Sequence, residues 1–140
     1  MIPKFRGRSV EAFSEEEWKY GYLIEDEGYS FIINQVIEAN EQYITIGSWC
    51  PVNPDTLGQS TGLRDYFGKE LFEGDVIEWS YWDEFEDSGT AKIIFDKGMF
   101  KLLDVCTEKS VWDNLFDCIE NCSVFLQGNI YENPELLEDK

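Results

Sequence analysis

The residue types that carry most enzyme chemistry are absent from this sequence or occur without a pattern. The chain contains no histidine, the commonest general base, so a Ser–His or Cys–His nucleophile pair cannot be built. It also lacks the glycine-rich loops G-x-x-x-x-G-K-[ST] and G-x-G-x-x-G that hold phosphate groups. The 29 acidic residues allow many carboxylate pairs, so no single pair stands out as a general acid and base. We therefore expect a protein that is not an enzyme and needs no cofactor.

The four cysteines give little support to a metal site. Cys118 and Cys122 have a loose metal-ligand spacing, but Cys50 and Cys106 are isolated and no paired C-x-x-C sequence is present. We expect reduced thiols, mostly buried as small apolar side chains, and no metal. Whether Cys118 and Cys122 bind a ligand of another kind is left open by the sequence.

One stretch combines aromatic and acidic side chains in a way that suits the binding of a basic protein partner. Residues 78–87 read EWSYWDEFED, which places aromatic anchors inside an acidic rim. The stretch lacks the ligand register of a calcium loop, so we expect a solvated hairpin loop rather than a cation site. In a competing interpretation, two or three of these rings, which include Trp79 and Tyr81, belong to the protein core. The predicted partner-binding residues are Trp82, Asp83, Glu84, Phe85, Glu86 and Asp87.

The charge balance separates the classes of partner. The chain has 29 acidic and 11 basic residues and a net charge of -18. Such a field repels nucleic acid and anionic lipid and attracts basic proteins. Lys4, Arg6 and Arg8 are the exception, and their alternate spacing places them on one face if the segment is extended. They are the main support for a nucleic-acid-binding barrel, which is the least favoured function.

Two further expectations concern location. The basic start of the chain is not followed by the apolar segment of a signal peptide. No run approaches the roughly 18 apolar residues that a membrane-spanning helix needs. We expect a cytoplasmic protein that does not bind membranes.

Most of the secondary-structure signals are those of strands. Aromatic and β-branched runs at residues 19–24 and 29–34 flank an acidic turn that ends in Gly28, which predicts a β-hairpin. Asn-Pro sequences predict helical turns at residues 53–58 and 133–137, and apolar spacing predicts a short helix within residues 111–122. The other predicted strands are residues 43–49, 69–72, 76–82, 90–95, 99–105 and 123–130.

These elements predict a mainly β protein. Short strands separated by tight turns indicate a small SH3-like barrel, with an N-terminal β-hairpin or meander region and one or two short helices. We place an N-terminal β-rich region at residues 1–57 and the barrel, with its C-terminal helical turn, at residues 58–140. The alternative is one compact unit, since the turn at 53–58 is the only boundary signal.

The stretch TGLRDYFGKELFEGDVIEW, residues 61–79, is explained by turn chemistry rather than by a ligand site. Gly68 and Gly74 lie where the chain must turn, and the short side chains of Asp65 and Asp75 are suited to hydrogen-bonding the turn backbone. The apolar residues between and after the turns fill a small core. We therefore expect residues 61–79 to form a corner of the fold, meaning two tight turns joined by short extended segments.

The segment GQSTGLRDYFGKELFEGDVIEW, the ending GNIYENPELL and the start MIPKFRGR together resemble the YopX family of small phage and prophage proteins. The resemblance is strongest over Gly58 to Val76 and Gly128 to Leu137. It implies a mostly β protein with an SH3-like barrel, encoded by a phage or prophage in a bacterial host. It implies no reaction, so no catalytic residues are carried over.

We therefore predict a non-enzymatic interaction module that binds a protein partner, of the host or the phage, through an acidic and aromatic surface. The alternative is an acidic mimic of nucleic acid that inhibits a DNA-binding protein of the host. A homo-oligomer is also possible, because the edge strands of a small sheet can pair with another chain.

Overall fold

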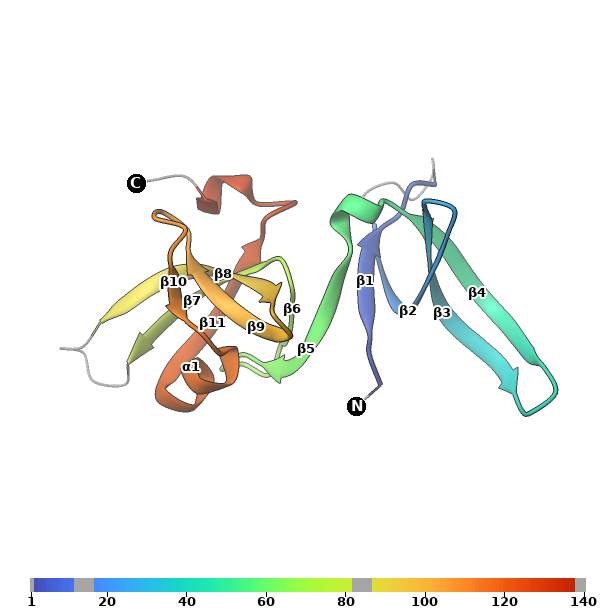
Figure 1. Ribbon diagram of the computed structural model, residues 1–140, viewed down its shortest axis with the longest axis horizontal. Helices are drawn as coiled ribbons and strands as arrows, with labels where there is room; N and C mark the ends of the chain where they lie inside the picture. The colour runs from blue at the N-terminus through green and yellow to red at the C-terminus, as the bar shows by residue number, and fades with distance from the viewer. Residues whose placement is uncertain (1, 12–16, 82–86, 138–140) are drawn as a thin grey trace. The chain divides into compact units, whose positions relative to one another are not determined.

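The chain divides into two compact units, Met1–Ser60 and Thr61–Lys140, which are described in turn. The computed structural model describes residues 2–11, 17–81 and 87–137 (Figure 1). Strand β5 (Gly58–Arg64) runs across the boundary. Its first residues pair with β1 in the first unit, and β6 follows it in the order of the strands.

The first unit is an antiparallel sheet with the strand order β4-β3-β2-β1-β5. The predicted hairpin at residues 19–34 is confirmed, and it turns at Glu27 and Gly28, which both have positive φ (51° and 86°). Asn53 caps the predicted helical turn by accepting a hydrogen bond from the amide of Asp55. The elements are β1 (Phe5–Arg8), β2 (Trp18–Asp26), β3 (Tyr29–Ala39), β4 (Ile44–Val52) and the 3-10 helix η1 (Pro54–Thr56).

The second unit is built on an antiparallel sheet with the strand order β10-β9-β8-β7-β11. Its strands follow the predicted sequence of short runs and tight turns, and the Asn-Pro sequence near the C-terminus forms a second 3-10 helix. The elements are β6 (Glu70–Phe72), β7 (Asp75–Tyr81), β8 (Ser88–Asp96), β9 (Met99–Asp104), β10 (Ser110–Trp112), α1 (Leu115–Asn121), β11 (Cys122–Asn129) and η2 (Pro134–Leu137).

The helix predicted within residues 111–122 begins later than its apolar spacing suggests. The side chain of Asn114 accepts a hydrogen bond from the Phe116 amide at 2.9 Å, which caps α1 and fixes its start at Leu115. Upstream of this cap, Trp112 pairs with Leu102 on β9. Val111 and Trp112 therefore belong to a strand, because an unpaired edge of β9 competes successfully with a helix.

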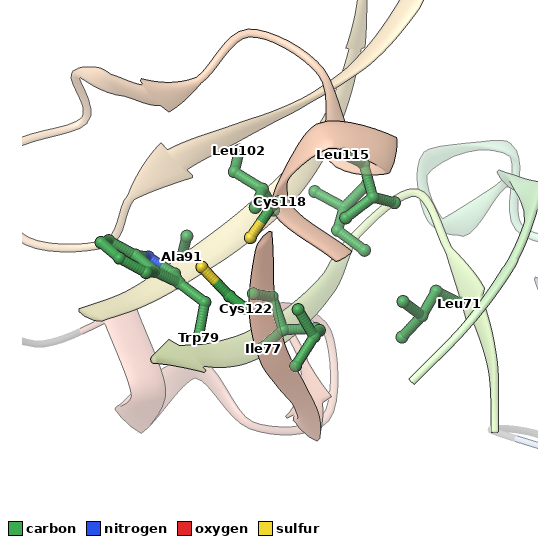
Figure 2. Close-up of a cluster of buried hydrophobic side chains, with 10 residues drawn as sticks. Leu71, Ile77, Trp79, Ala91, Leu102, Leu115, Cys118 and Cys122 are labelled. Carbon is green, nitrogen blue, oxygen red and sulfur yellow. The ribbon is translucent and has the colours of Figure 1, made fainter. Parts of the chain in front are cut away.

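The core of the second unit lies between α1 and the sheet (Figure 2). Ile77 and Trp79 of β7 are buried while Glu78 between them is exposed, as the predicted alternation of this strand requires. Leu115 and Cys118 of α1 are fully buried against the same cluster. The mainly β class is confirmed. In the first unit, an isolated antiparallel bridge between Ser9 and Val52 also joins the end of β1 to the end of β4.

Asp65 holds the corner that the stretch TGLRDYFGKELFEGDVIEW forms. Its side chain is buried and accepts hydrogen bonds from the amides of Phe67 at 3.0 Å and Lys69 at 2.8 Å, which closes the turn. Its other oxygen accepts from the amide of Leu126 on β11 at 3.0 Å. The amide of Tyr66 donates to the carbonyl of Val124 on the same strand at 2.7 Å. One carboxylate thus joins the turn to a strand about 60 residues further along the chain.

Two more motifs of the resemblance have the same structural explanation. Asp75 accepts a hydrogen bond from the Phe72 amide at 2.7 Å across the second turn, where Gly74 has a φ of 93°. Near the C-terminus, Asn133 accepts from the Asn129 amide at 3.2 Å. These short polar side chains close backbone turns, so the prediction of turn chemistry is confirmed.

Replacing Asp65 with alanine should destabilise the second unit strongly. Three backbone amides lose their acceptor at a buried position, and we expect the free energy of unfolding to fall by about 3 kcal/mol. Asp65→Asn retains one carbonyl oxygen and should cost about half as much. Chemical denaturation of the three proteins checks the order, and equal stability of Asp65→Ala and the parent protein would contradict the role of Asp65.

The cysteines differ in exposure. Cys106 is exposed, whereas Cys50, Cys118 and Cys122 are buried. Figure 2 shows the sulfur atoms of Cys118 and Cys122 pointing towards one another. Burial, followed by the nearby Cys122 thiol, raises the pKa of Cys118 well above its ordinary value of 9.0.

The raised pKa of Cys118 predicts a loss of stability in alkaline solution. Below pH 9.0 the thiol is protonated in both states, so its contribution to stability is fully present. Above pH 9.0 the unfolded chain releases this proton while the folded protein retains it, so the free energy of unfolding falls. Denaturation on both sides of this pH should show a steeper fall for the parent protein than for Cys118→Ala. Identical slopes would contradict the prediction.

Candidate partner-binding pocket

A hollow of about 460 Å³ lies on the second unit, lined by residues of β7, β8, β9 and β10 and by Asp87 before β8. We call it the aromatic pocket. Its apolar wall is formed by three aromatic rings and one valine, and its rim carries two carboxylates. The residues that line it are Trp79, Tyr81, Asp87, Ser88, Gly89, Asp104, Val111 and Trp112.

The three rings of the pocket contact one another. Trp79 and Tyr81 share a face of β7, and their ring centroids are 5.9 Å apart with the planes at 87°. Trp112 meets Trp79 at 5.9 Å, also at 87°, and Tyr81 at 6.1 Å. Such edge-to-face arrangements suit aromatic rings because the positive edge of one ring meets the negative face of the next.

Strand pairing brings Trp112 to this cluster. In the strand order β10-β9-β8-β7, Trp112 and Trp79 are three strand spacings apart, which is about 14 Å in a flat sheet. Their ring contact at 5.9 Å shows that both side chains reach across the strands between them, which the twist of a β-sheet assists. The pocket is therefore a product of strand pairing between segments that are distant in sequence.

Gly89 makes room for Trp79. The two residues are cross-strand partners on β8 and β7, and a Cβ atom at position 89 would lie 3.1 Å from the indole nitrogen of Trp79. A side chain at this position would therefore push the indole ring away from the strand. The glycine places Trp79 flat against β8, where 8% of its surface remains exposed.

Two indole N–H groups of the ring cluster have no acceptor among the described residues. The Nε1 atoms of Trp79 and Trp112 are covered by other protein atoms. A buried donor without an acceptor costs about 1–3 kcal/mol. Because these atoms are covered, a ligand in the pocket contacts the rings and not the N–H groups.

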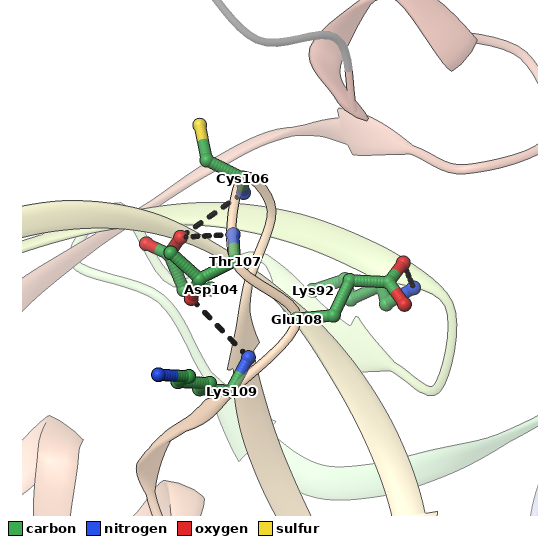
Figure 3. Close-up of polar contacts among 6 residues, drawn as sticks. All are labelled: Lys92, Asp104, Cys106, Thr107, Glu108 and Lys109. Carbon is green, nitrogen blue, oxygen red and sulfur yellow. Dashed lines mark hydrogen bonds and ion pairs between the residues drawn. The ribbon is translucent and has the colours of Figure 1, made fainter.

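Backbone amides hold the carboxylate of Asp104 at the rim. Asp104 accepts hydrogen bonds from the amides of Cys106 at 3.0 Å and Thr107 at 2.9 Å, which fixes its side chain (Figure 3). Asp87 is exposed, and its main-chain carbonyl accepts from the Tyr81 amide at 3.2 Å, which joins the ends of β7 and β8. The pocket thus places two aspartates beside the aromatic rings.

The predicted site residues have different outcomes. Asp87 lies at the rim of the pocket, while Trp82, Asp83, Glu84, Phe85 and Glu86 lie outside the described residues. Trp79 is a core residue as well as a pocket residue, in line with the competing interpretation of the aromatic stretch.

Sequence reasoning missed Val111 and Trp112, because their spacing with Leu115 and Ile119 indicated a helix. The capping asparagine at position 114 was the signal that separates them from that helix. Sequence reasoning also missed Gly89. The sequence does not show that this glycine lies opposite Trp79, because that depends on how β7 and β8 pair.

The basic residues near the start of the chain are engaged within the first unit. Arg6 lies over the ring of Trp18 at 4.6 Å and Arg8 lies over the same ring at 5.9 Å, while Lys4 lies over Tyr20 at 5.7 Å. The prediction that these cations share a strand face is in line with their shared contacts across β2. Arg6 is buried, so this arrangement favours packing over contact with phosphate.

The described residues contain neither a group of metal-binding side chains nor a membrane-spanning helix. Within residues 2–11, 17–81 and 87–137, no three or more His, Cys, Asp or Glu side chains are grouped to hold a metal ion. No helix in the same part of the chain has the length and apolar character needed to cross a membrane.

The comparisons with known proteins concern family and fold. The sequence matches the family described as YopX protein over residues 5–138. The structure is similar to protein EF1440 from Enterococcus faecalis, with 27% identity, a TM-score of 0.65 and 99% of each chain covered. It is also similar to protein yopX from Bacillus subtilis, with 18% identity, a TM-score of 0.56 and 98% of each chain covered, a likeness of fold alone. No curated protein matches the chain.

Replacing Gly89 with alanine should disturb the pocket without adding charge. The new methyl group meets the Trp79 indole, and we expect the free energy of unfolding to fall by about 1–2 kcal/mol. Indole fluorescence of the folded protein should change as well, because the ring moves. Ser88→Ala on the same strand is the matched control and should change stability by less than about 0.5 kcal/mol. Equal stability of Gly89→Ala and Ser88→Ala would contradict the packing described here.

Proposed function

The chain belongs to the YopX family, and we propose that it is a non-enzymatic interaction module that binds a basic segment of a protein partner at the aromatic pocket. The observation that carries the proposal is the meeting of three aromatic rings beside two aspartates. We propose a partner that belongs to a bacterial host or to a phage, which the resemblance to phage and prophage proteins supports.

The aromatic faces and the carboxylates both favour a cation. A lysine or arginine positioned over an aromatic face gains about 0.5–2 kcal/mol, with the larger value when water is excluded. Asp87 and Asp104 add charge complementarity at the rim. Arginine suits the site better than lysine, because its planar guanidinium group can stack on a ring while it donates hydrogen bonds to a carboxylate.

The whole-chain charge supports the same class of partner. A net charge of -18 raises the local concentration of basic proteins and speeds their association at low salt. Charge alone would also support the alternative, an acidic mimic that occupies a nucleic-acid-binding groove. The two differ in their response to salt, because a partner held by aromatic contacts retains affinity after the charges are screened.

The direct experiment is a titration with synthetic peptides, observed by indole fluorescence. The panel contains arginine peptides, lysine peptides and the same sequences with glutamine at the basic positions. We expect arginine peptides to bind most tightly and glutamine peptides not to bind. Equal binding of the arginine, lysine and glutamine peptides would contradict the proposal. Binding that vanishes completely at high salt would favour the alternative, an acidic mimic of nucleic acid.

Variants at the pocket should separate ring and charge contributions. Trp112→Phe keeps an aromatic ring but a smaller one, and we expect arginine-peptide affinity to fall about tenfold. Asp87→Lys reverses an exposed rim charge and should weaken binding by a similar factor at low salt and by less at high salt.

Asp117→Lys makes the same charge change on the exposed face of α1, away from the residues that line the pocket, and is the matched control. It should leave affinity within about twofold of the parent protein once salt screens the long-range field. If Asp117→Lys weakens binding as much as Asp87→Lys at high salt, the pocket is not the binding site.

A further inference from the structure

The first unit carries an apolar arm whose surface is not used by its own core. The arm is the distal part of the β3–β4 hairpin, and Figure 1 shows it extending beyond β1 and β2 of the same unit. It is a defined hairpin, because the side chain of Asn40 accepts hydrogen bonds from the amides of Gln42 and Tyr43 at the tip. Its large apolar residues are 39–66% exposed and comprise Val36, Ile37, Tyr43, Ile44, Ile46 and Trp49.

Part of the arm is an open strand edge. β4 is the last strand in the order β4-β3-β2-β1-β5. Near its end the outer edge is occupied, because Pro51 accepts a hydrogen bond from the Val10 amide and the Asn53 amide donates to Arg8. Before this point, residues 44–49 have no partner on the outer edge among the described residues.

This edge lacks charge and proline, two of the usual protections against pairing with another chain, although the β3–β4 ladder contains register irregularities, one of them at Gly47. Natural proteins place charges, lysine above all, or proline on exposed edge strands. No charged residue occurs between Gln42 and Asn53, and no lysine or arginine occurs between Lys19 and Arg64. The open part of β4 reads ITIGSW, with β-branched and aromatic residues and no proline.

We infer that β4 pairs with β4 of a second copy of this chain, antiparallel across a two-fold axis. Two copies with a net charge of -18 repel one another over most of their surface, so they approach where neither carries charge. A two-fold axis places the same uncharged strand on both sides, so every facing pair within residues 44–49 is uncharged whatever the register. A basic partner finds no carboxylate on this strand.

Side-chain geometry supports contact between copies in addition to strand pairing. Val36 and Ile46 are cross-strand partners, and Ala39 pairs with Ile44, so aliphatic side chains line the arm beside its open edge. The pairing satisfies backbone groups of the edge and covers these side chains together. This interface lies in the first unit and does not rest on the function proposed for the aromatic pocket.

The test measures molar mass by light scattering over a dilution series of the whole protein. We expect twice the mass of one 16.3 kDa chain at high concentration and dissociation on dilution. Hydrogen exchange on the same samples should show protection of the residue 44–49 amides that increases with concentration. A single chain at every concentration, or open-ended assemblies without a discrete dimer, would overturn the inference.

Two lysine variants locate the interface. Ile46→Lys and Ile44→Lys each place a cation on the pairing strand of both copies, and each should weaken dimerisation at least about tenfold. Ile24→Lys is the matched control, because Ile24 of β2 is 45% exposed and Ile46 is 42% exposed. Near-UV circular dichroism confirms that each variant is folded. Dimerisation that survives both arm variants, or that Ile24→Lys abolishes equally, would overturn the assignment to β4.

Discussion

The packing of Trp79 against Gly89 is the contact on which the second unit and its pocket depend. It requires a glycine opposite a tryptophan on the neighbouring strand, and it presses the indole ring onto the sheet. Tyr81 and Trp112 then pack against the edges and faces of that ring. The same ring belongs to the core cluster with Leu115 and Cys118. The site proposed for binding is therefore continuous with the core, which makes its aromatic wall rigid before a partner arrives.

Buried carboxylates and amides keep the surrounding turns in place. Asp65 holds one turn to β11, Asp75 closes the next, and Asn133 closes the turn that follows β11. These contacts use short polar side chains at positions where the backbone has no other acceptor. The residues that make the sequence resemble its family are the ones that form these contacts. The family motifs are therefore explained by the fold. The proposed function rests on other residues, chiefly Trp79, Trp112 and the rim carboxylates.

Much of the fold could be predicted because its signals are local. The hairpin that turns at Gly28, the capped turn at Asn53 and the corner at Asp65 are each set by residues within a few positions of one another. The start of α1 was misjudged because apolar residues at positions 111 and 112 fit both a helix and a strand, and pairing with β9 decided between them.

The candidate site was less predictable for the same reason. Trp112 meets Trp79 only because four strands pair in the order β10-β9-β8-β7, and no local pattern encodes that contact. The predicted residues Trp82 to Glu86 lie outside the described part of the chain, so the prediction for them stands as it was made.

The central claim is that a basic peptide binds at Trp79 and Trp112, and the most direct measurement observes the indole groups themselves. In a nitrogen–proton spectrum the five tryptophans give separate indole signals, which single Trp→Phe variants assign. On addition of an arginine peptide we expect the signals of Trp79 and Trp112 to shift, because the bound guanidinium group changes the surroundings of their rings. The signals of Trp18 and Trp49 in the first unit should stay in place. Shifts confined to Trp18 or Trp49, or no shift at saturating peptide, would contradict the account.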